Sequence, residues 1–395
     1  MHEIEKAYCN VCIGAVIAAW RSLMETPAIQ VLTKVKYGKG DTLGLDAISE
    51  ITIEHRIKSF DAYGILITEE IGESSGIRWP SDPDPVMQPL MLFSDPTDRS
   101  SQLVRFYKKI SEKESVKKIG ELMTSMSDGQ IVELWESIHG MPEKPAIITG
   151  ATTSITCLRK GKLIFTVILN YITQDIFVAC GVGIFYFKLP HFSNKKINSI
   201  NLDHIARNGK PLHFLPSVST CQTADDFKKF VSFLGTPEKK GYSDNFQDCM
   251  IFVESPDKFV HHRVPGGPAR VLYLSELQKG CGPIGFIMAN GEKISEWIHW
   301  LTFAKFAKNQ HGANALRVFE VSIDRPWTKD GVLMSTPPQY SIFRMTEEGT
   351  YLDMSRLKNF HSPSRFRSML VITPYDNERI IQIMRQHQYR EILVI

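Results

Sequence analysis

Two apolar segments in the first hundred residues end on acidic side chains that could bind a divalent cation. The run "YGILITEE" ends on Glu69 and Glu70, and the run "LMLFSDPTD" carries Asp95 and Asp98 at its end. Carboxylate oxygens are the ligands that hard cations such as Mg²⁺ prefer, although Asp and Pro are also common in turns. Open α/β sheets place their ligands at the carboxyl ends of strands. Two strands that both end on acids therefore favour a metal site over a plain turn.

These acids belong to three motifs that occur in one order along the chain. The motifs are "GDTLGLDAIS" (40–49), "LITEE" (66–70) and "FSDPTDRSS" (93–101). The set resembles the superfamily of magnesium-dependent, lithium-sensitive phosphatases that contains inositol monophosphatase and fructose-1,6-bisphosphatase, and it is more similar to fructose-1,6-bisphosphatase. Weaker similarity extends to "CGVGIFYFKLP" (180–190) and to "FHSPSRFRSMLVITPYDNERI" (360–380).

The resemblance implies roles for particular residues of this chain. The metal ligands would be Glu69, Asp95, Asp98, the Thr97 carbonyl and, at the start of a helix in the second half, Glu296. The residues that orient or deprotonate the attacking water would be Glu70 and Asp46 with help from Asp41, and Asp98 would be both a catalytic residue and a metal ligand. The substrate phosphate would meet Arg99, Ser100, Ser101, Arg263 and Lys293.

Each of these assignments has a structural alternative. An acid at a strand end can be a helix cap or a surface residue, and Glu296 can be an acid that favours a helix dipole. The alignment of Glu296 is open, because the inositol monophosphatase pattern would place Ile298 where an Asp is needed. Arg263 and Lys293 can equally be solvated cations.

Arg99 is the clearest departure from the family pattern, which has a glycine after the second Asp of DPxD. That glycine lets the backbone approach a phosphate at the start of the following helix. The Arg99 side chain could add a charge-assisted contact to the phosphate, or it could block the pocket. The family's Asn-Glu-Gly-Tyr substrate segment also has no clear counterpart near residues 209–219.

A phosphate monoester is anionic and resists attack by water, so its hydrolysis needs cations that neutralise the phosphoryl oxygens and activate a water. The function expected from the resemblance is therefore Mg²⁺- or Mn²⁺-dependent hydrolysis of a sugar phosphate, with fructose-1,6-bisphosphate as the leading substrate and gluconeogenesis as the context. The alternatives are a family member that has lost turnover and binds a phosphorylated ligand, or an inositol or nucleotide phosphatase. The resemblance also implies a homo-oligomer, a dimer or tetramer, that binds a small phosphorylated sugar or polyol.

Composition excludes several other classes of protein. The 395 residues carry 46 basic and 43 acidic side chains, a net charge of +3 that gives no chain-wide basic field for nucleic acid. The apolar runs are interrupted before the roughly 20 residues that span a bilayer, and the N-terminus lacks the basic region of a signal peptide. The seven cysteines are an odd number in apolar segments, which favours reduced thiols and a cytoplasmic protein. The lone pair Cys9 and Cys12 is expected on a buried helix face.

Periodicity predicts an α+β protein. The resemblance implies the layered α/β/α/β fold of the sugar phosphatases, in which two mixed sheets have helices between and outside them. In the first half we expect helices at 3–25 and 47–60 and, besides the two strands that end on acids, strands at 146–157, 162–172 and 175–188. In the second half we expect strands at 249–255, 283–290 and 367–374 and helices at 268–280, 295–309 and 376–387. The predicted domains are residues 1–205, with a helical insertion at about 101–145 that could be a lid or an oligomer contact, and residues 206–395.

Overall fold

The computed structural model describes a large part of the chain as two compact units. The described residues are 1–37, 42–60, 64–72, 77–79, 90–140, 150–191, 195–212, 248–254, 259–265, 282–289, 294–308, 311–322, 343–346, 349–352, 368–374, 381–382, 385 and 390–392. The first unit is built mainly from Met1–Pro211, and Ile294–Thr302 also joins it. It therefore differs from the predicted range 1–205 by including a later segment. The remaining described strands belong to the second unit.

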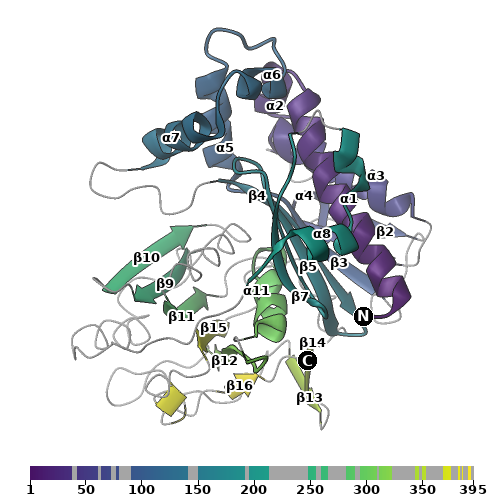
Figure 1. Cartoon of the computed structure of the whole chain (residues 1–395), viewed down its shortest axis with the longest axis vertical. Coiled ribbons are helices and arrows are strands. Elements are labelled where there is room, and N and C mark those ends of the chain that lie inside the picture. The colour runs from purple at the N-terminus through teal and green to yellow at the C-terminus, as the bar shows by residue number, and fades with distance from the viewer. Residues whose placement is uncertain are drawn as a thin grey trace. The chain divides into compact units, whose positions relative to one another are not determined.

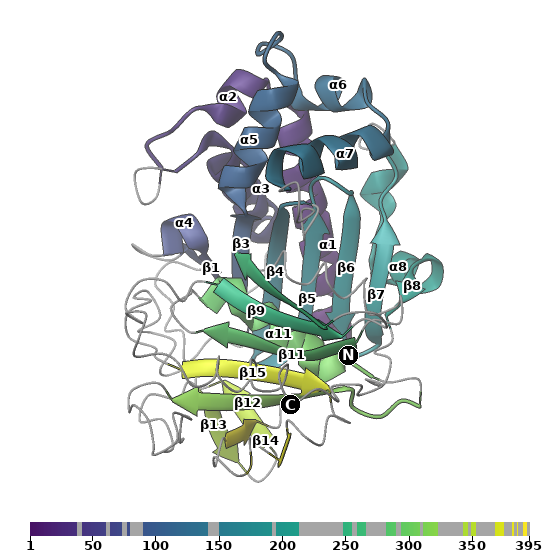
Figure 2. The ribbon, with the colours of Figure 1, turned by 90° about the vertical axis from the view of Figure 1, so that its left-hand side faces the viewer.

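A mixed sheet of eight strands forms the centre of the first unit (Figures 1 and 2). Its order is β2-β1-β3-β4-β5-β6-β7-β8, in which β1 and β3 are parallel and all other neighbours are antiparallel. The strands are β1 (Gly64–Thr68), β2 (Ile77–Trp79), β3 (Leu90–Asp98), β4 (Thr152–Arg159), β5 (Lys162–Asn170), β6 (Asp175–Cys180), β7 (Gly183–Lys188) and β8 (Lys210–Pro211). The α+β fold class is confirmed.

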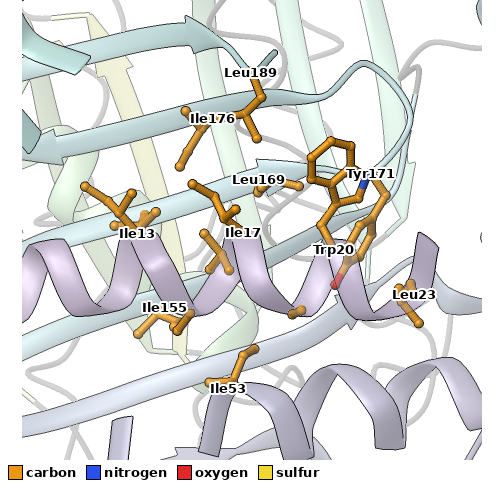
Figure 3. Packing of buried hydrophobic residues seen from close by; sticks show 14 of the residues in the cluster. Ile13, Ile17, Trp20, Leu23, Ile53, Ile155, Leu169, Tyr171, Ile176 and Leu189 are labelled. Atoms are coloured by element: carbon orange, nitrogen blue, oxygen red, sulfur yellow. The ribbon is translucent and has the colours of Figure 1, made fainter. Parts of the chain in front are cut away.

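Helices α1 (Glu3–Glu25) and α3 (Gly44–Lys58) pack against each other and against this sheet, and both were predicted. Ile13, Ile17 and Trp20 of α1 are buried in a cluster with Ile155 and Leu169 of the sheet (Figure 3). By length and composition α1 could also cross a membrane. Its burial against the sheet is that of a core helix, and Cys9 and Cys12 are buried free thiols on it, as predicted. Shorter helices are α2 (Ala28–Leu32), α4 (Glu69–Gly72), η1 (Lys195–Ser199) and α8 (Leu202–Asn208).

The segment predicted as an insertion contains three helices: α5 (Ser100–Ile110), α6 (Ile119–Thr124) and α7 (Asp128–His139). Phe106, Leu122 and Trp135 from these helices are buried in the same hydrophobic core as α1. Helix α6 packs on α1, and α5 packs on α7. The prediction of a lid is therefore wrong, because the apolar faces that would have to open are part of the core.

The segment predicted as one strand, 175–188, is a hairpin of β6 and β7. The two strands pair from Cys180 opposite Gly183 to Asp175 opposite Lys188. Gly183 has φ +134°, a conformation that only glycine adopts readily. The glycines on either side of Val182 were the turn signal that the continuous apolar run obscured.

The second unit contains a six-stranded sheet in the order β10-β9-β11-β15-β12-β16 and the separate hairpin β13–β14. The elements are β9 (Asp248–Glu254), β10 (Phe259–Pro265), β11 (Gly282–Ala289), β12 (Leu316–Ser322), β13 (Phe343–Thr346), β14 (Gly349–Leu352), β15 (Ser368–Pro374) and β16 (Arg390–Ile392), and helix α11 (Ile294–Phe306) has residues in both units.

The prediction of two mixed sheets needs a correction, because every described pairing in the second sheet is antiparallel. Residues 255–258 join β9 to β10, and a connection that short permits only antiparallel pairing. The predicted strands at 249–255, 283–290 and 367–374 are confirmed by β9, β11 and β15, and the helix at 295–309 by α11. The predicted helix at 268–280 lies outside the described residues, as does most of that at 376–387.

Candidate functional site

The parallel pairing of β1 and β3 brings two of the three acidic motifs to one edge of the sheet. Thr68, the last residue of β1, pairs with Ser94 of β3. Glu69 and Asp95 each follow directly in the chain, so the register places them beside each other. The expectation that neighbouring strand ends deliver acids to the same edge is thus confirmed for these two positions.

A β-bulge in β3 turns Asp95 and Asp98 to the same face of the sheet. Side chains alternate along a regular strand, so two residues three positions apart would lie on opposite faces. In β3, however, Asp95 pairs with Ser154 of β4 and Asp98 pairs with Thr152, only two residues away. Two residues of β3, Pro96 and Thr97, therefore lie opposite the single residue Thr153 of β4. This bulge places the two carboxylates on the same face.

The bulge is buried and held by hydrogen bonds within the motif and from β4. Asp95, Thr97 and Asp98 have exposed fractions of 1%, 3% and 5%. The Thr97 backbone N–H donates to Oδ1 of Asp95 (3.1 Å), and the Thr153 hydroxyl donates to the Asp95 carbonyl (3.4 Å). Buried carboxylates are rare unless they are paired or coordinate a metal. This burial favours a role other than a surface turn.

Glu70 is also buried, and residues that the motif analysis did not assign hold it. The Thr42 hydroxyl donates to Oε2 of Glu70 (2.6 Å), and the Glu70 backbone N–H donates to Oε2 of Glu50 (3.1 Å). The Tyr37 hydroxyl donates to Oε1 of Glu50 (3.3 Å). Glu50 is fully buried on α3. An acid directly after Ser49, on a helix whose first turn carries Asp46, was the sequence signal for it.

Helix α3 presents Asp46 in its first turn and Ser49 one turn later, and both side chains are buried. The helix can begin where it does because of Gly44, where an added Cβ would lie 2.2 Å from the carbonyl oxygen of Gln30. The Ser49 hydroxyl lies 3.2 Å from the Tyr171 hydroxyl, which donates to the Pro96 carbonyl (2.9 Å). Burial raises the pKa of Tyr171, so its hydroxyl stays protonated and can donate. The first and third motifs are thus linked.

Three buried hydroxyls at this edge of the sheet have no hydrogen-bond partner among the described residues. They are Oγ1 of Thr68, Oγ of Ser94 and Oγ1 of Thr152. Thr68 pairs with Ser94 in the ladder, and Thr152 pairs with Asp98. Buried polar groups without a protein partner usually meet water or an ion. Ser94 directly precedes Asp95, so Ser94 and its partner Thr68 point to the opposite face of the sheet, whereas Thr152 shares the face of Asp98. The Thr152 hydroxyl and the carboxylates are oxygen donors of the kind that suits Mg²⁺ or Mn²⁺.

Within the described ranges, no three His, Cys, Asp or Glu side chains are arranged as a group that could hold a metal ion. Two of the acids predicted as metal ligands or catalytic residues are outside that search. Asp41 lies outside the described residues, and the Glu296 side chain is not described, although its backbone is in α11. Residues Ile294–Thr302 of α11 belong to the first unit, the unit that holds the acidic motifs. Glu69, Asp95 and Asp98 were within the search, so the described acids alone do not form such a group, although their carboxylate oxygens are donors that suit a hard cation.

Arg99 adopts the left-handed backbone conformation, with φ 64° and ψ 35°, immediately before α5. This is the conformation for which the family's glycine is suited. The Arg99 guanidinium donates from Nη1 to the Gly150 carbonyl (2.9 Å), and its Cζ lies 5.4 Å from the ring centroid of Trp135. The side chain thus contacts α7 and Gly150, two residues before β4. These contacts account for an arginine at a position that strains its backbone.

The helices around Arg99 form an aromatic cluster with it. Trp135 lies 5.8 Å from Phe106 and 4.3 Å from His139, measured between ring centroids. Burial and the charges of Arg99 and Arg105 lower the pKa of His139, so a neutral imidazole packs on Trp135. The absence of a second positive charge beside Trp135 favours the cation–π contact with Arg99.

Substitution of Arg99 separates the backbone strain from the side-chain contacts. Arg99→Ala loses the contacts with Gly150 and Trp135 and keeps the strained φ, whereas Arg99→Gly loses the same contacts and relieves the strain. We expect both variants to be less stable than wild type, and Arg99→Ala to be the less stable of the two by about 1 kcal/mol. Urea unfolding of the two proteins checks this, and equal midpoints would contradict the left-handed conformation.

The other predicted substrate residues are less closely defined. Ser100 is the first residue of α5 and is half-buried, and the exposed Ser101 donates its hydroxyl to the side chain of Gln102 (2.8 Å). Arg263 is in β10 of the second unit, where its backbone pairs with Met250. Lys293 lies outside the described residues.

No family model matches the chain, and no curated protein matches it. Several solved structures are similar. SuhB, the extragenic suppressor protein of Bartonella henselae, is 20% identical over 46% of this chain and 51% of its own, with a TM-score of 0.28. CysQ from Bacteroides thetaiotaomicron, a bacterial member of the inositol monophosphatase family, is 11% identical over 60% of this chain and 70% of its own, with a TM-score of 0.32.

Fructose-1,6-bisphosphatase from Leishmania major is 14% identical over 58% of this chain and 64% of its own, with a TM-score of 0.32. The match spans about half the length of the SuhB structure. Because the three TM-scores are below 0.5, no activity is carried over from these proteins to this chain.

Proposed function

We propose that this chain is a phosphoric monoester hydrolase that uses Mg²⁺ or Mn²⁺ and acts on a sugar phosphate. The observation that carries the proposal is the bulge in β3, which turns Asp95 and Asp98 to one face of the sheet. The neighbouring parallel strand ends directly before Glu69 and Glu70. The buried hydroxyl of Thr152, which pairs with Asp98, supports it, because this hydroxyl has no hydrogen-bond partner among the described residues.

In this proposal Glu69, Asp95 and Asp98 hold the ion, with the Thr97 carbonyl and Glu296 as further ligands. Bound there, the ion supplies positive charge that neutralises the phosphoryl oxygens and favours ionisation of the attacking water. Glu70 accepts the proton of that water. Its Oε2 atom is already held by Thr42, so the carboxylate is oriented before the substrate arrives. Asp46 is the second proton acceptor, and Asp41 assists.

The phosphate of the substrate would lie at the start of α5, where the backbone N–H groups of Ser100 and Ser101 are in the first turn of an 11-residue helix. Arg99 contributes through its backbone there, since its guanidinium donates to the Gly150 carbonyl. Substrate contacts by Arg263 and Lys293 stay predictions from the motif resemblance. The motif resemblance makes fructose-1,6-bisphosphate the first substrate to test, before inositol and nucleotide phosphates.

Phosphate release by the purified full chain tests the proposal. We expect inorganic phosphate to be released from at least one sugar phosphate with Mg²⁺ or Mn²⁺, and excess EDTA to stop the release. Absence of release from sugar, inositol and nucleotide monoesters with either ion would contradict it. Calorimetry would then identify the alternative, a protein that binds a phosphorylated ligand without hydrolysing it.

A further inference from the structure

A buried chain of hydroxyl groups lies behind the bulge that carries Asp95 and Asp98. The Thr97 hydroxyl donates to Oγ of Ser49 (3.4 Å), Ser49 lies 3.2 Å from the Tyr171 hydroxyl, and Tyr171 donates to the Pro96 carbonyl (2.9 Å). Ser49 and Tyr171 are fully buried, and Thr97 is 3% exposed. The chain of hydrogen bonds therefore begins at Thr97 and ends at Pro96, which are neighbouring residues of β3.

The direction of these hydrogen bonds follows from the number of protons available. Tyr171 has one hydroxyl proton, which it donates to Pro96, so Ser49 must donate to Tyr171. The Ser49 oxygen then accepts from Thr97. In this direction each of the three hydroxyls donates once, and the oxygens of Ser49 and Tyr171 also accept. The side chains of Thr97 and Thr153 are further hydrogen-bonding neighbours of the Tyr171 hydroxyl. Chains of this kind strengthen each bond through polarisation.

The chain of hydroxyls hydrogen-bonds the backbone of β3 at the bulge, where the pairing of β3 with β4 is interrupted. The register of β3 against β4 shifts between Asp95 and Asp98, and the bulge is at Pro96 and Thr97. A carbonyl at a bulge lacks its regular ladder partner, and a buried carbonyl without a partner is costly. Tyr171 supplies that partner from the residue directly after β5.

We infer that Tyr171, acting with Ser49, is a positioning residue that fixes the Pro96–Thr97 bulge and so sets the directions of the Asp95 and Asp98 carboxylates. Ser49 is one helical turn after Asp46 on α3, so the same bonds also set that helix against the bulge. The role of Tyr171 in the reaction rests on the proposed function, whereas its role in holding the bulge does not. This division allows the two to be tested separately.

The test compares Tyr171→Phe and Ser49→Ala with Tyr8→Phe as the matched control. Tyr8 is 1% exposed in the same core, and its hydroxyl has no hydrogen-bond partner among the described residues. Hydrogen exchange of metal-free protein is followed in peptides that cover residues 90–100. We expect exchange at Thr97 and Asp98 to be about tenfold faster in Tyr171→Phe and in Ser49→Ala, and unchanged in Tyr8→Phe.

Titration with Mn²⁺ alone gives the second readout. We expect wild type to bind the ion and Tyr171→Phe to bind it about 10- to 100-fold more weakly, as is typical when support of metal ligands is lost. Faster exchange in Tyr171→Phe with no Mn²⁺ binding by wild type would retain the positioning role and overturn the proposed metal site. Exchange in Tyr171→Phe equal to that in Tyr8→Phe would overturn the inference, whatever the metal result.

Discussion

Asp98→Asn should lower kcat for phosphate release by at least about 100-fold while leaving the fold intact, since a metal site supplies several kcal/mol of charge stabilisation. Asp98 is the last residue of β3, is 5% exposed and lies on the same face as Asp95. Asparagine keeps the size and shape of the side chain but removes its negative charge. Steady-state kinetics on the substrate that wild type hydrolyses, with circular dichroism as the check on folding, measures the effect.

Asp175→Asn is the control for that substitution. Asp175 is half-buried at the first residue of β6, at the same edge of the sheet and three strands away from β3. Burial raises its pKa, so loss of its charge should affect the fold little. We expect kcat within about twofold of wild type, because surface and half-buried changes away from a site are usually mild. An Asp98→Asn enzyme as active as Asp175→Asn would contradict a catalytic role for Asp98.

Trp135→Ala should destabilise the protein by about 3 to 5 kcal/mol, the range for truncation of large buried aromatics. Trp135 is fully buried and contacts Phe106, His139 and the Arg99 guanidinium. Its loss leaves a cavity between α5 and α7 and removes the cation–π contact. The midpoint of urea unfolding, followed by circular dichroism, measures the change.

Trp135→Phe is the companion variant, because it keeps an aromatic ring over which the Arg99 guanidinium can lie. It should recover more than half of the stability that Trp135→Ala loses. If Trp135→Ala and wild type have the same midpoint of urea unfolding, helix α7 is not part of the core. The helical segment 101–145 could then be a lid.

The sequence was most informative where one physical rule determined the outcome. Apolar runs that end on Glu69 and Asp95 predicted neighbouring strand ends with acids, because strand ends are where open sheets place polar ligands. The helices α1 and α3 followed from their apolar periodicity. These features depend on local pattern, which a single sequence records directly.

Features that depend on tertiary contacts could not be predicted in the same way. The odd spacing of Asp95 and Asp98 says nothing about their faces until the pairing with β4 reveals the bulge. The destination of the Arg99 side chain depends on Trp135 and Gly150, which are 36 and 51 residues away in sequence. Tyr171 was missed for the same reason, since only the fold brings it to Ser49 and Pro96. Glu50 directly follows the first motif, but its contact with the Glu70 backbone depends on the fold.

A crystal of the full chain soaked in Mn²⁺ tests the central claim most directly, because the anomalous scattering of manganese locates the ion without reference to activity. The account predicts an anomalous peak at about 2.1 to 2.2 Å from carboxylate oxygens of both Asp95 and Asp98, with Glu69 as a further ligand. An absence of any peak at these carboxylates at saturating Mn²⁺, with the bulge of β3 intact in the same crystal, would contradict it.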